Sequence, residues 1–209
     1  MDFESRFEIK YNLKDFDEIF IKKNILNSTN LNKIYEDRII NSIYFDTNNF
    51  ICANDNLSGQ SARKKFRLRS YNNNSNYNFE IKIKENKLTR KILFNKNIFL
   101  KNKNIKFQKI NNFLKKNYLI KICKISYLRS YYKFKDLRVT YDRNLKYESL
   151  INNNGISKMK SKDKILEIKY KHSNQNIKSL NHFTFRLPIT ASRNSKYLNS
   201  LNELGIIKF

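Results

Sequence analysis

A run of basic residues spaced two apart makes the stretch from residue 62 to residue 85 the part of the chain best suited to bind phosphate. Arg63, Lys65, Arg67 and Arg69 fall on one side of an extended strand, because side chains alternate between the two faces of a strand. After an Asn-rich turn, a second run carries one acid and two lysines on one face: Glu80, Lys82 and Lys84. The pattern predicts a hairpin with one charged and one apolar side. Taken alone, it also fits an ordinary hairpin whose charges face water.

The same alternation recurs in other parts of the chain. Charged faces occur at 6–10, 138–142 and 167–171, and Arg129 lies between two tyrosines. So many strands with a basic face predict an α+β fold, in which a closed antiparallel barrel has a charged lumen and amphipathic helices cover its apolar outside. Unpaired cations crowded across a lumen repel one another, so such a barrel should hold a strongly anionic ligand.

Hydrophobic periodicity predicts the elements that position these residues. Amphipathic helices are expected at 13–26 and 105–118, and a C-terminal helix should end near Leu204. Segment 50–60 is expected to be helical or irregular. Further strands are expected at 39–47, 87–94 and 121–134. Residues 149–163 are expected to form a polar loop, and 173–182 a connection.

Composition limits the number of domains and the kinds of ligand that the protein can bind. A chain of 209 residues with 40% apolar content and no Pro-rich or Gly-rich linker is expected to form one domain, residues 1–209. With 3 glycines it has neither a GxxxxGK[ST] nor a GxGxxG motif, so side chains must hold any phosphate. The formal charge of +25 points to a polyanion: nucleic acid, an anionic membrane surface or polyphosphate.

The cysteines bear on possible metal sites and disulfides, and the apolar runs bear on the cellular location of the protein. Cys52 and Cys123 lie far apart with only two histidines in the chain, which supports neither a zinc site nor a disulfide framework. The N-terminus is charged from Asp2 onward, and no apolar run approaches the ~18 residues of a membrane helix. A cytoplasmic protein is expected, with a peripheral position at the inner face of a membrane as the alternative.

Several runs resemble one family when they are taken in order. They are NSIYFDT at 41–47, RKKFRLRSY at 63–71, FEIKIKE at 79–85, RVTYDRNL at 138–145, LEIKYK at 166–171 and SRNSKYL at 192–198. Together they resemble the VTC domain, the catalytic domain of the vacuolar transporter chaperone polyphosphate polymerases, a branch of the triphosphate tunnel metalloenzymes. The resemblance implies an eight-stranded antiparallel tunnel, a divalent metal, Mn²⁺ or Mg²⁺, and the substrates ATP and inorganic polyphosphate.

Site residues follow from the resemblance and from the charged faces. The catalytic candidates are Arg67, Arg69, Lys82, Arg129 and Lys196. The substrate-binding candidates are Lys10, Lys65, Lys84, Tyr127, Arg138, Lys169, Arg193 and Ser195. By motif, Glu167 matches the metal-binding glutamate of the family, and a hard cation commonly takes one or two carboxylates plus substrate phosphates. Glu8 and Glu80 either join it or form salt bridges with neighbouring cations.

Departures from the family pattern bear on the reaction. The tunnel phosphatases and cyclases begin with ExExK, whereas this chain has Arg6, Glu8 and Lys10. The change favours a metal-dependent polyphosphate polymerase over a two-metal triphosphatase. Hydrolysis or binding of short polyphosphates remains the alternative, and a nucleic-acid-binding module is more remote, because most aromatic residues lie opposite the charges. The chain lacks the SPX domain and membrane helices of the eukaryotic proteins, so coupling to transport would require a separate membrane protein.

Overall fold

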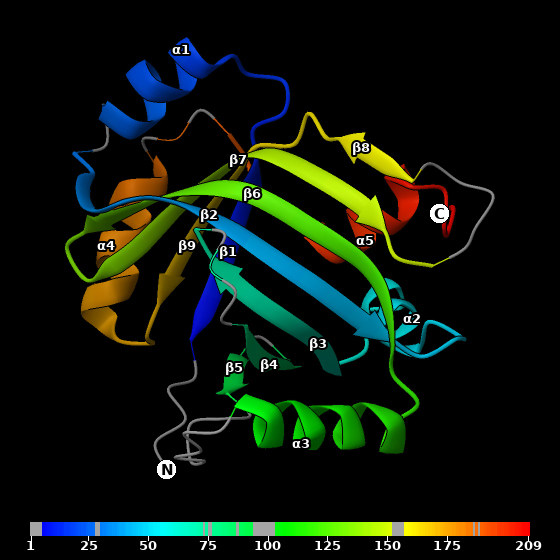
Figure 1. The fold of residues 1–209 in the computed structure, drawn as a ribbon. Helices are drawn as coiled ribbons and strands as arrows, with labels where there is room; N and C mark the ends of the chain where they lie inside the picture. The colour runs from blue at the N-terminus through cyan, green and yellow to red at the C-terminus, as the bar shows by residue number, and fades with distance from the viewer. Residues whose placement is uncertain are drawn as a thin grey trace.

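A computed structural model describes residues 6–27, 30–72, 74, 77–86, 88–93, 103–151, 157–185, 187 and 189–209. Its centre is one antiparallel sheet, drawn in Figure 1. The strands in spatial order are β1 (Phe7–Asn12), β9 (Ile165–Tyr170), β7 (Leu137–Ser149), β6 (Ile120–Phe134), β2 (Asn32–Asp46), β3 (Ala62–Tyr71), β4 (Asn78–Glu85) and β5 (Leu88–Leu93). A short strand, β8 (Lys158–Lys160), pairs with the free part of β7. The predicted hairpin is β3 and β4.

The sheet curls until its two end strands meet at one point. Arg6, just before β1, and Thr89 on β5 exchange two backbone hydrogen bonds of 3.0 Å each. Side chains also cross this seam, because Nζ of Lys82 on β4 lies 2.6 Å from a carboxylate oxygen of Glu8 on β1. The predicted eight-strand order is present, but the prediction of a fully closed barrel is wrong. β1 and β5 are 6 residues each, and among the described residues the bridge near their first residues is the only pairing between them, so no continuous ladder joins them.

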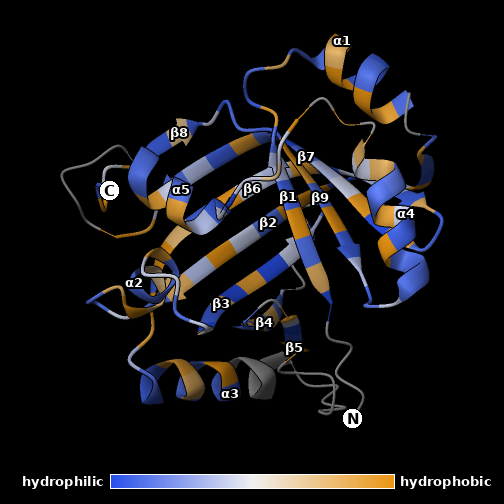
Figure 2. Cartoon of the chain, turned by 180° about the vertical axis from the view of Figure 1, so that it is seen from behind, coloured by the Kyte–Doolittle hydropathy of each residue, from blue (hydrophilic) through white to orange (hydrophobic). Residues whose placement is uncertain are grey.

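Helices cover the apolar side of β1, β9 and β7. There α1 (Glu18–Phe20), the π-helix η1 (Ile21–Asn27) and α4 (Asn174–Phe185) surround a core cluster. Ile21 and Ile25 come from η1, and Leu180 and Phe183 from α4. The strands alternate between hydrophobic and hydrophilic residues, as Figure 2 shows, and this alternation gives the sheet its apolar side.

Two more core clusters complete the packing. On β3 and β4, α3 (Lys103–Lys116) buries Ile110 and Leu114 against the apolar side of the hairpin. At one end of the sheet, α2 (Ile51–Leu57) and α5 (Lys196–Glu203) pack on β2 and β6, and Leu201 of α5 is fully buried. No helix in the described part of the chain is long and apolar enough to cross a membrane.

Three predicted elements need correction. The helix expected at 13–26 begins only at Glu18, because the carboxylate of Asp17 caps it by accepting a hydrogen bond from the amide of Phe20. Helical spacing predicts that Ile19 lies on the apolar side of this helix, but its side chain is 78% exposed. The loop expected at 149–163 contains β8, because β7 extends far enough to pair with it. Its residues 152–156 lie outside the described ranges. The connection expected at 173–182 is α4, which Leu180 and Phe183 hold on the sheet.

Candidate functional site

One face of the sheet gathers the charged side chains that the alternation predicted. Arg67 lies directly opposite Glu80, and Lys10 directly opposite Glu167. Directly opposite residues of antiparallel strands point to the same side, so the register places basic and acidic groups next to one another. We call this the inner face, because the curling of the sheet brings the two ends of the strand order together across it.

Glu80 organises the part of the inner face that β3, β4 and β5 form. Its Oε2 accepts from Nε of Arg67 at 2.9 Å and lies 2.7 Å from Nη2 of the same guanidinium. Nζ of Lys91 lies 3.1 Å from Oε1, and Nη1 of Arg69 lies 3.8 Å from Oε2. Burial raises the pKa of Glu80, but these cations outweigh it and lower the pKa to about 2. The carboxylate therefore stays charged and fixes both arginines.

Asp142 on β7 organises the opposite part of the inner face. Nε and Nη2 of Arg129 donate to its two oxygens at 2.6 and 2.7 Å, a two-point contact that fixes the plane of the guanidinium. Nζ of Lys196, the first residue of α5, lies 2.7 Å from Oδ2. The ring of Tyr127 lies 5.3 Å from the guanidinium carbon and 4.9 Å from the ammonium, within the range of cation–π attraction.

Glu8 and Glu167 form a third group with three lysines. Lys82 is 2.6 Å from Glu8, and Lys169 lies between the carboxylates, 3.1 Å from Glu167 and 3.9 Å from Glu8. Lys10 lies 3.7 Å from Glu167. Burial raises the pKa of Glu167, yet the surrounding cations, Lys169 first, hold it well below its ordinary value. Both acids are thus salt-bridged to neighbouring cations.

The N-terminus of α5 closes the inner face at one end. The hydroxyl of Ser195 caps this helix and also accepts a hydrogen bond of 2.8 Å from Nζ of Lys65 on β3. Two residues after Ser195, the hydroxyl of Tyr197 donates to the buried carboxylate of Asp46 at 2.8 Å. Asp46 also accepts from the amides at the start of α2. These bonds hold α5, and with it Lys196, over the strands.

Two lysines of the inner face, Lys65 and Lys82, have a lowered pKa. Burial lowers the pKa of Lys65 well below its ordinary value, and the nearby ammonium groups of Lys10 and Lys82 lower it further. Burial likewise lowers the pKa of Lys82 to about 8, although Glu8 opposes the shift. A bound anion would favour the charged forms of these lysines.

Every predicted site residue lies within the described part of the chain, but not all of them take part in the contacts of the inner face. Arg67, Arg69, Lys82, Arg129, Lys196, Lys10, Lys65, Tyr127, Lys169, Ser195 and Glu167 take part in the contacts above. Lys84 lies farther along β4, opposite Arg63. Arg138 is exposed, with its guanidinium carbon 5.7 Å from the centre of the Tyr131 ring, and Arg193 is exposed in the segment just before α5. The roles assigned to all of them remain predictions.

Several residues of the inner face were not assigned to the site from the sequence. The hydroxyl of Tyr44 accepts from Nη1 of Arg67 at 3.3 Å, and that of Ser42 accepts from Nε of Arg69 at 3.1 Å. Both lie on β2 directly opposite their arginines. The period-two spacing of Ser42, Tyr44 and Asp46 is the signal that could have found them.

A divalent metal would find few ligands of its own on the inner face. Among the described residues no group of three or more His, Cys, Asp and Glu side chains could hold one. Glu167 and Glu8, which share Lys169, are the carboxylates next to the lysine cluster. Two carboxylates are compatible with Mg²⁺ or Mn²⁺ only if bound phosphates supply further oxygen ligands. The donor set therefore fits a metal that arrives with its substrate.

Solved structures with little sequence identity have the same fold. A protein from Pyrococcus horikoshii is 14% identical with a TM-score of 0.54, and the match covers 95% of this chain and 98% of that one. A candidate adenylate cyclase from Vibrio parahaemolyticus is 12% identical, with a TM-score of 0.55 and coverage of 92% and 95%. A candidate adenylyl cyclase from Hippeastrum, described as having a dominant triphosphatase activity, is 12% identical, with a TM-score of 0.54 and coverage of 93% and 94%.

Sequence comparison defines the family more closely. No curated protein sequence matches the chain. The family model described as the VTC domain matches residues 5–204, nearly the whole chain, in agreement with the resemblance of the six motifs. The protein therefore belongs to the VTC domain family.

Proposed function

We propose that this protein is a polyphosphate polymerase, which transfers the terminal phosphate of ATP to a growing chain of inorganic polyphosphate. The carrying observation is the excess of cations over acids on the inner face, where Arg69 and Arg129 are buried and the others, apart from the exposed Lys91, are partly buried. The basic residues Lys10, Lys65, Arg67, Arg69, Lys82, Lys91, Arg129, Lys169 and Lys196 outnumber the acids Glu8, Glu80, Asp142 and Glu167. Phosphoryl transfer requires mainly charge neutralisation and alignment, which such a face supplies without a protein nucleophile.

In the proposed reaction, a terminal oxygen of the polyphosphate chain attacks the γ-phosphorus of ATP. The bond from the γ-phosphorus to the β,γ-bridging oxygen breaks, and ADP leaves with that electron pair. Arg67, Arg69 and Arg129 neutralise the transferred group, because each is held by a carboxylate, tyrosine or serine that fixes its direction. Lys82 and Lys196 supply further charge near the same point. The chain lengthens by one phosphate in each cycle.

The remaining candidates bind the two phosphate chains in this proposal. They are Lys10, Lys65, Lys84, Tyr127, Arg138, Lys169, Arg193 and Ser195. Glu167, with Glu8 beside it, would hold Mn²⁺ or Mg²⁺, and the ion would neutralise phosphate charge.

Hydrolysis of triphosphate or short polyphosphate by the same face is the second candidate. The triphosphatase activity described for the Hippeastrum protein supports it, since both chains have one fold. Arg6, which stands where the ExExK motif of the hydrolytic branch has its first acid, favours transfer. Without that acid, the face has fewer ligands for a second metal.

The experiment that separates the two is incubation of purified protein with ATP and Mn²⁺, followed by gel analysis for polymer and by measurement of free phosphate. Polymer that grows with time, with ADP released in equal amount, supports transfer. Free phosphate without polymer identifies a hydrolase. Neither product, in Mn²⁺ or Mg²⁺ and with a short polyphosphate primer, would refute both proposals.

A paired assay tests the nucleic-acid alternative on Arg67→Ala, Arg69→Ala and Arg129→Ala. Convergent arginines stabilise one transition state, so each variant should lose on the order of 10²-fold in turnover. A nucleic-acid strip would instead lose oligonucleotide affinity modestly and uniformly, with the salt slope reduced by roughly one. Lys115→Gln/Lys116→Gln at the exposed end of α3 is the control for general loss of positive charge.

A further inference from the structure

Part of the sheet carries none of the described helices on its outer side. Figure 1 shows β2, β6 and β7 crossing the front of the molecule uncovered, with β8 beside the end of β7. The core clusters agree, since the helices pack on β1, β7 and β9, on β3 and β4, and against the inner side near α5. The side chains on the open part of β6, β7 and β8 therefore face solvent.

These side chains form a regular array of two rows across three strands. The first row is Lys124, Glu148 and Lys158, and the second is Ser126, Lys146 and Lys160, each residue directly opposite its neighbour. The array lines a hollow of about 420 Å³, which we call the outer lysine groove. Rows two residues apart are separated by about 7 Å and adjacent strands by about 5 Å, so the four lysines start from one small patch.

The groove has more positive charge than its one acid can neutralise. Glu148 serves both lysines of its row, at 3.9 Å from Lys124 and 3.6 Å from Lys158. Lys146 lies directly opposite Lys160, and neither has a carboxylate within 4 Å in the described part of the chain. Like charges at directly opposite positions repel, so the empty groove is destabilised.

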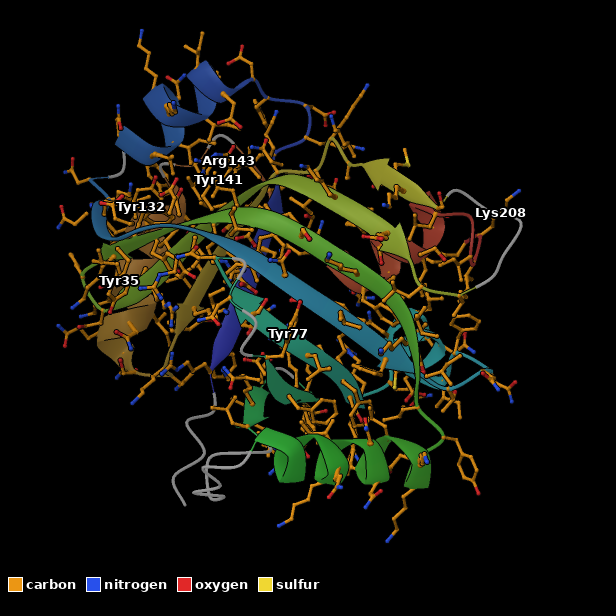
Figure 3. All side chains as sticks on the ribbon, viewed as in Figure 1. Tyr35, Tyr77, Tyr132, Tyr141, Arg143 and Lys208 are labelled. Carbon is orange, nitrogen blue, oxygen red and sulfur yellow. The ribbon has the colours of Figure 1, made fainter. Side chains whose placement is uncertain are left out.

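Two basic residues elsewhere on the outer side share one carboxylate. Arg143, labelled in Figure 3 beside Tyr141, has Nη2 2.7 Å from the carboxylate of Asp37. Lys33 lies 3.2 Å from the same carboxylate. Lys146 and Lys160 differ from these two residues, because they have no described carboxylate within 4 Å and lie together in a hollow.

We propose that the outer lysine groove is a second binding site, outside the inner face, for a short linear chain of phosphates. The compact patch of ammonium groups matches a ligand with several negative charges in close succession. Tyr147, which borders the hollow, is buried and offers no exposed ring on which a nucleic-acid base could stack. This site is independent of the reaction on the inner face.

The test is a titration of the full-length protein with tripolyphosphate at low salt, followed by calorimetry and by backbone amide NMR. The wild type should show two sites, with amide shifts at residues 124–126, 146–148 and 158–160 that saturate separately from those in β3 and β4. Lys146→Gln/Lys160→Gln should weaken only the groove site, by about 2- to 30-fold, the range expected for two exposed ion contacts. Inorganic phosphate should bind the groove more weakly, and ATP should show whether a nucleotide is also accepted.

Lys115→Gln/Lys116→Gln on α3 removes the same charge from an exposed helix end and should leave both sites unchanged. The groove variant, Lys146→Gln/Lys160→Gln, removes two like charges that repel, so its melting temperature should not fall. If it does fall, the single variant Lys160→Gln, on the short strand β8, replaces it. Equal weakening by the groove and control variants, or no tripolyphosphate shifts at residues 124–126, 146–148 and 158–160, would overturn the inference. Loss of inner-face binding alone would count against the proposed function and leave the groove intact.

Discussion

Glu80→Gln isolates the contribution of one inner-face carboxylate to stability. Glu80 is 2% exposed, and Arg67, Arg69 and Lys91 surround it. The neutral amide keeps the size of the side chain but leaves these cations without their shared partner. Breaking a buried ion pair from one side typically costs about 3–5 kcal/mol. We expect the free energy of unfolding at neutral pH to fall by an amount in this range.

The pKa of Glu80 gives a second estimate of the same quantity. Its ordinary value is 4.5 and its value in the folded protein is about 2. At 1.36 kcal/mol per pKa unit, this difference corresponds to about 3 kcal/mol. Because the pKa is lowered by folding, the stabilisation is fully present above about pH 4.5 and is lost as the pH falls towards 2. The two estimates agree within their precision.

The measurement is urea unfolding of the wild type and Glu80→Gln between pH 7 and pH 2.5. The difference in unfolding free energy between them should be largest at neutral pH and should shrink below pH 4.5. Glu148→Gln, which removes a carboxylate that is 35% exposed in the outer groove, should change stability by less than about 1 kcal/mol. A Glu80→Gln protein as stable as the wild type at pH 7, or a difference that does not change with pH, would refute the reasoning.

Three further predictions concern the same face. Binding of tripolyphosphate at pH 8 should be accompanied by proton uptake at Lys82, because a bound anion raises the pKa of this lysine from about 8. Calorimetry in buffers of different ionisation enthalpy measures the number of protons taken up. Tyr197→Phe should lower stability by roughly 1.5–3 kcal/mol in thermal or urea unfolding, because it removes a buried hydrogen bond to the carboxylate of Asp46. Glu167→Gln should abolish Mn²⁺-dependent ATP consumption, and equal rates in the two proteins at saturating metal would disprove its role.

Local patterns were enough to predict the strands of the hairpins, and the pairs within them follow once the register is known. The alternation of 62–85 predicted β3 and β4, and with the register known, Arg67 must lie opposite Glu80. A tight turn at Lys135 and Asp136 sets Arg129 opposite Asp142 in the same way. In both hairpins the paired strands are close in sequence, so the local pattern of charged and apolar residues is enough to predict that the strands form.

Other features depend on contacts between distant segments, and the sequence could not predict them. α4 was taken for a connection because its apolar residues are few, and only the cluster under Leu180 and Phe183 stabilises the helix. The contact from Lys82 to Glu8 spans 74 residues of sequence and exists only because the sheet curls. The extent of that curling, which leaves one bridge and no closed ladder, follows from packing and not from periodicity.

Arginines and lysines play different parts on the inner face, because their partners differ. Nε and Nη2 of Arg67 and of Arg129 are directed at Glu80 and Asp142, so these guanidinium groups are fixed before any ligand arrives. Lys65 has a serine hydroxyl as its hydrogen-bond partner, and burial lowers its pKa. The lysines are therefore the groups with most to gain from an anion, while the arginines supply a preorganised direction. A phosphate chain would be attracted mainly by the lysines and aligned mainly by the arginines.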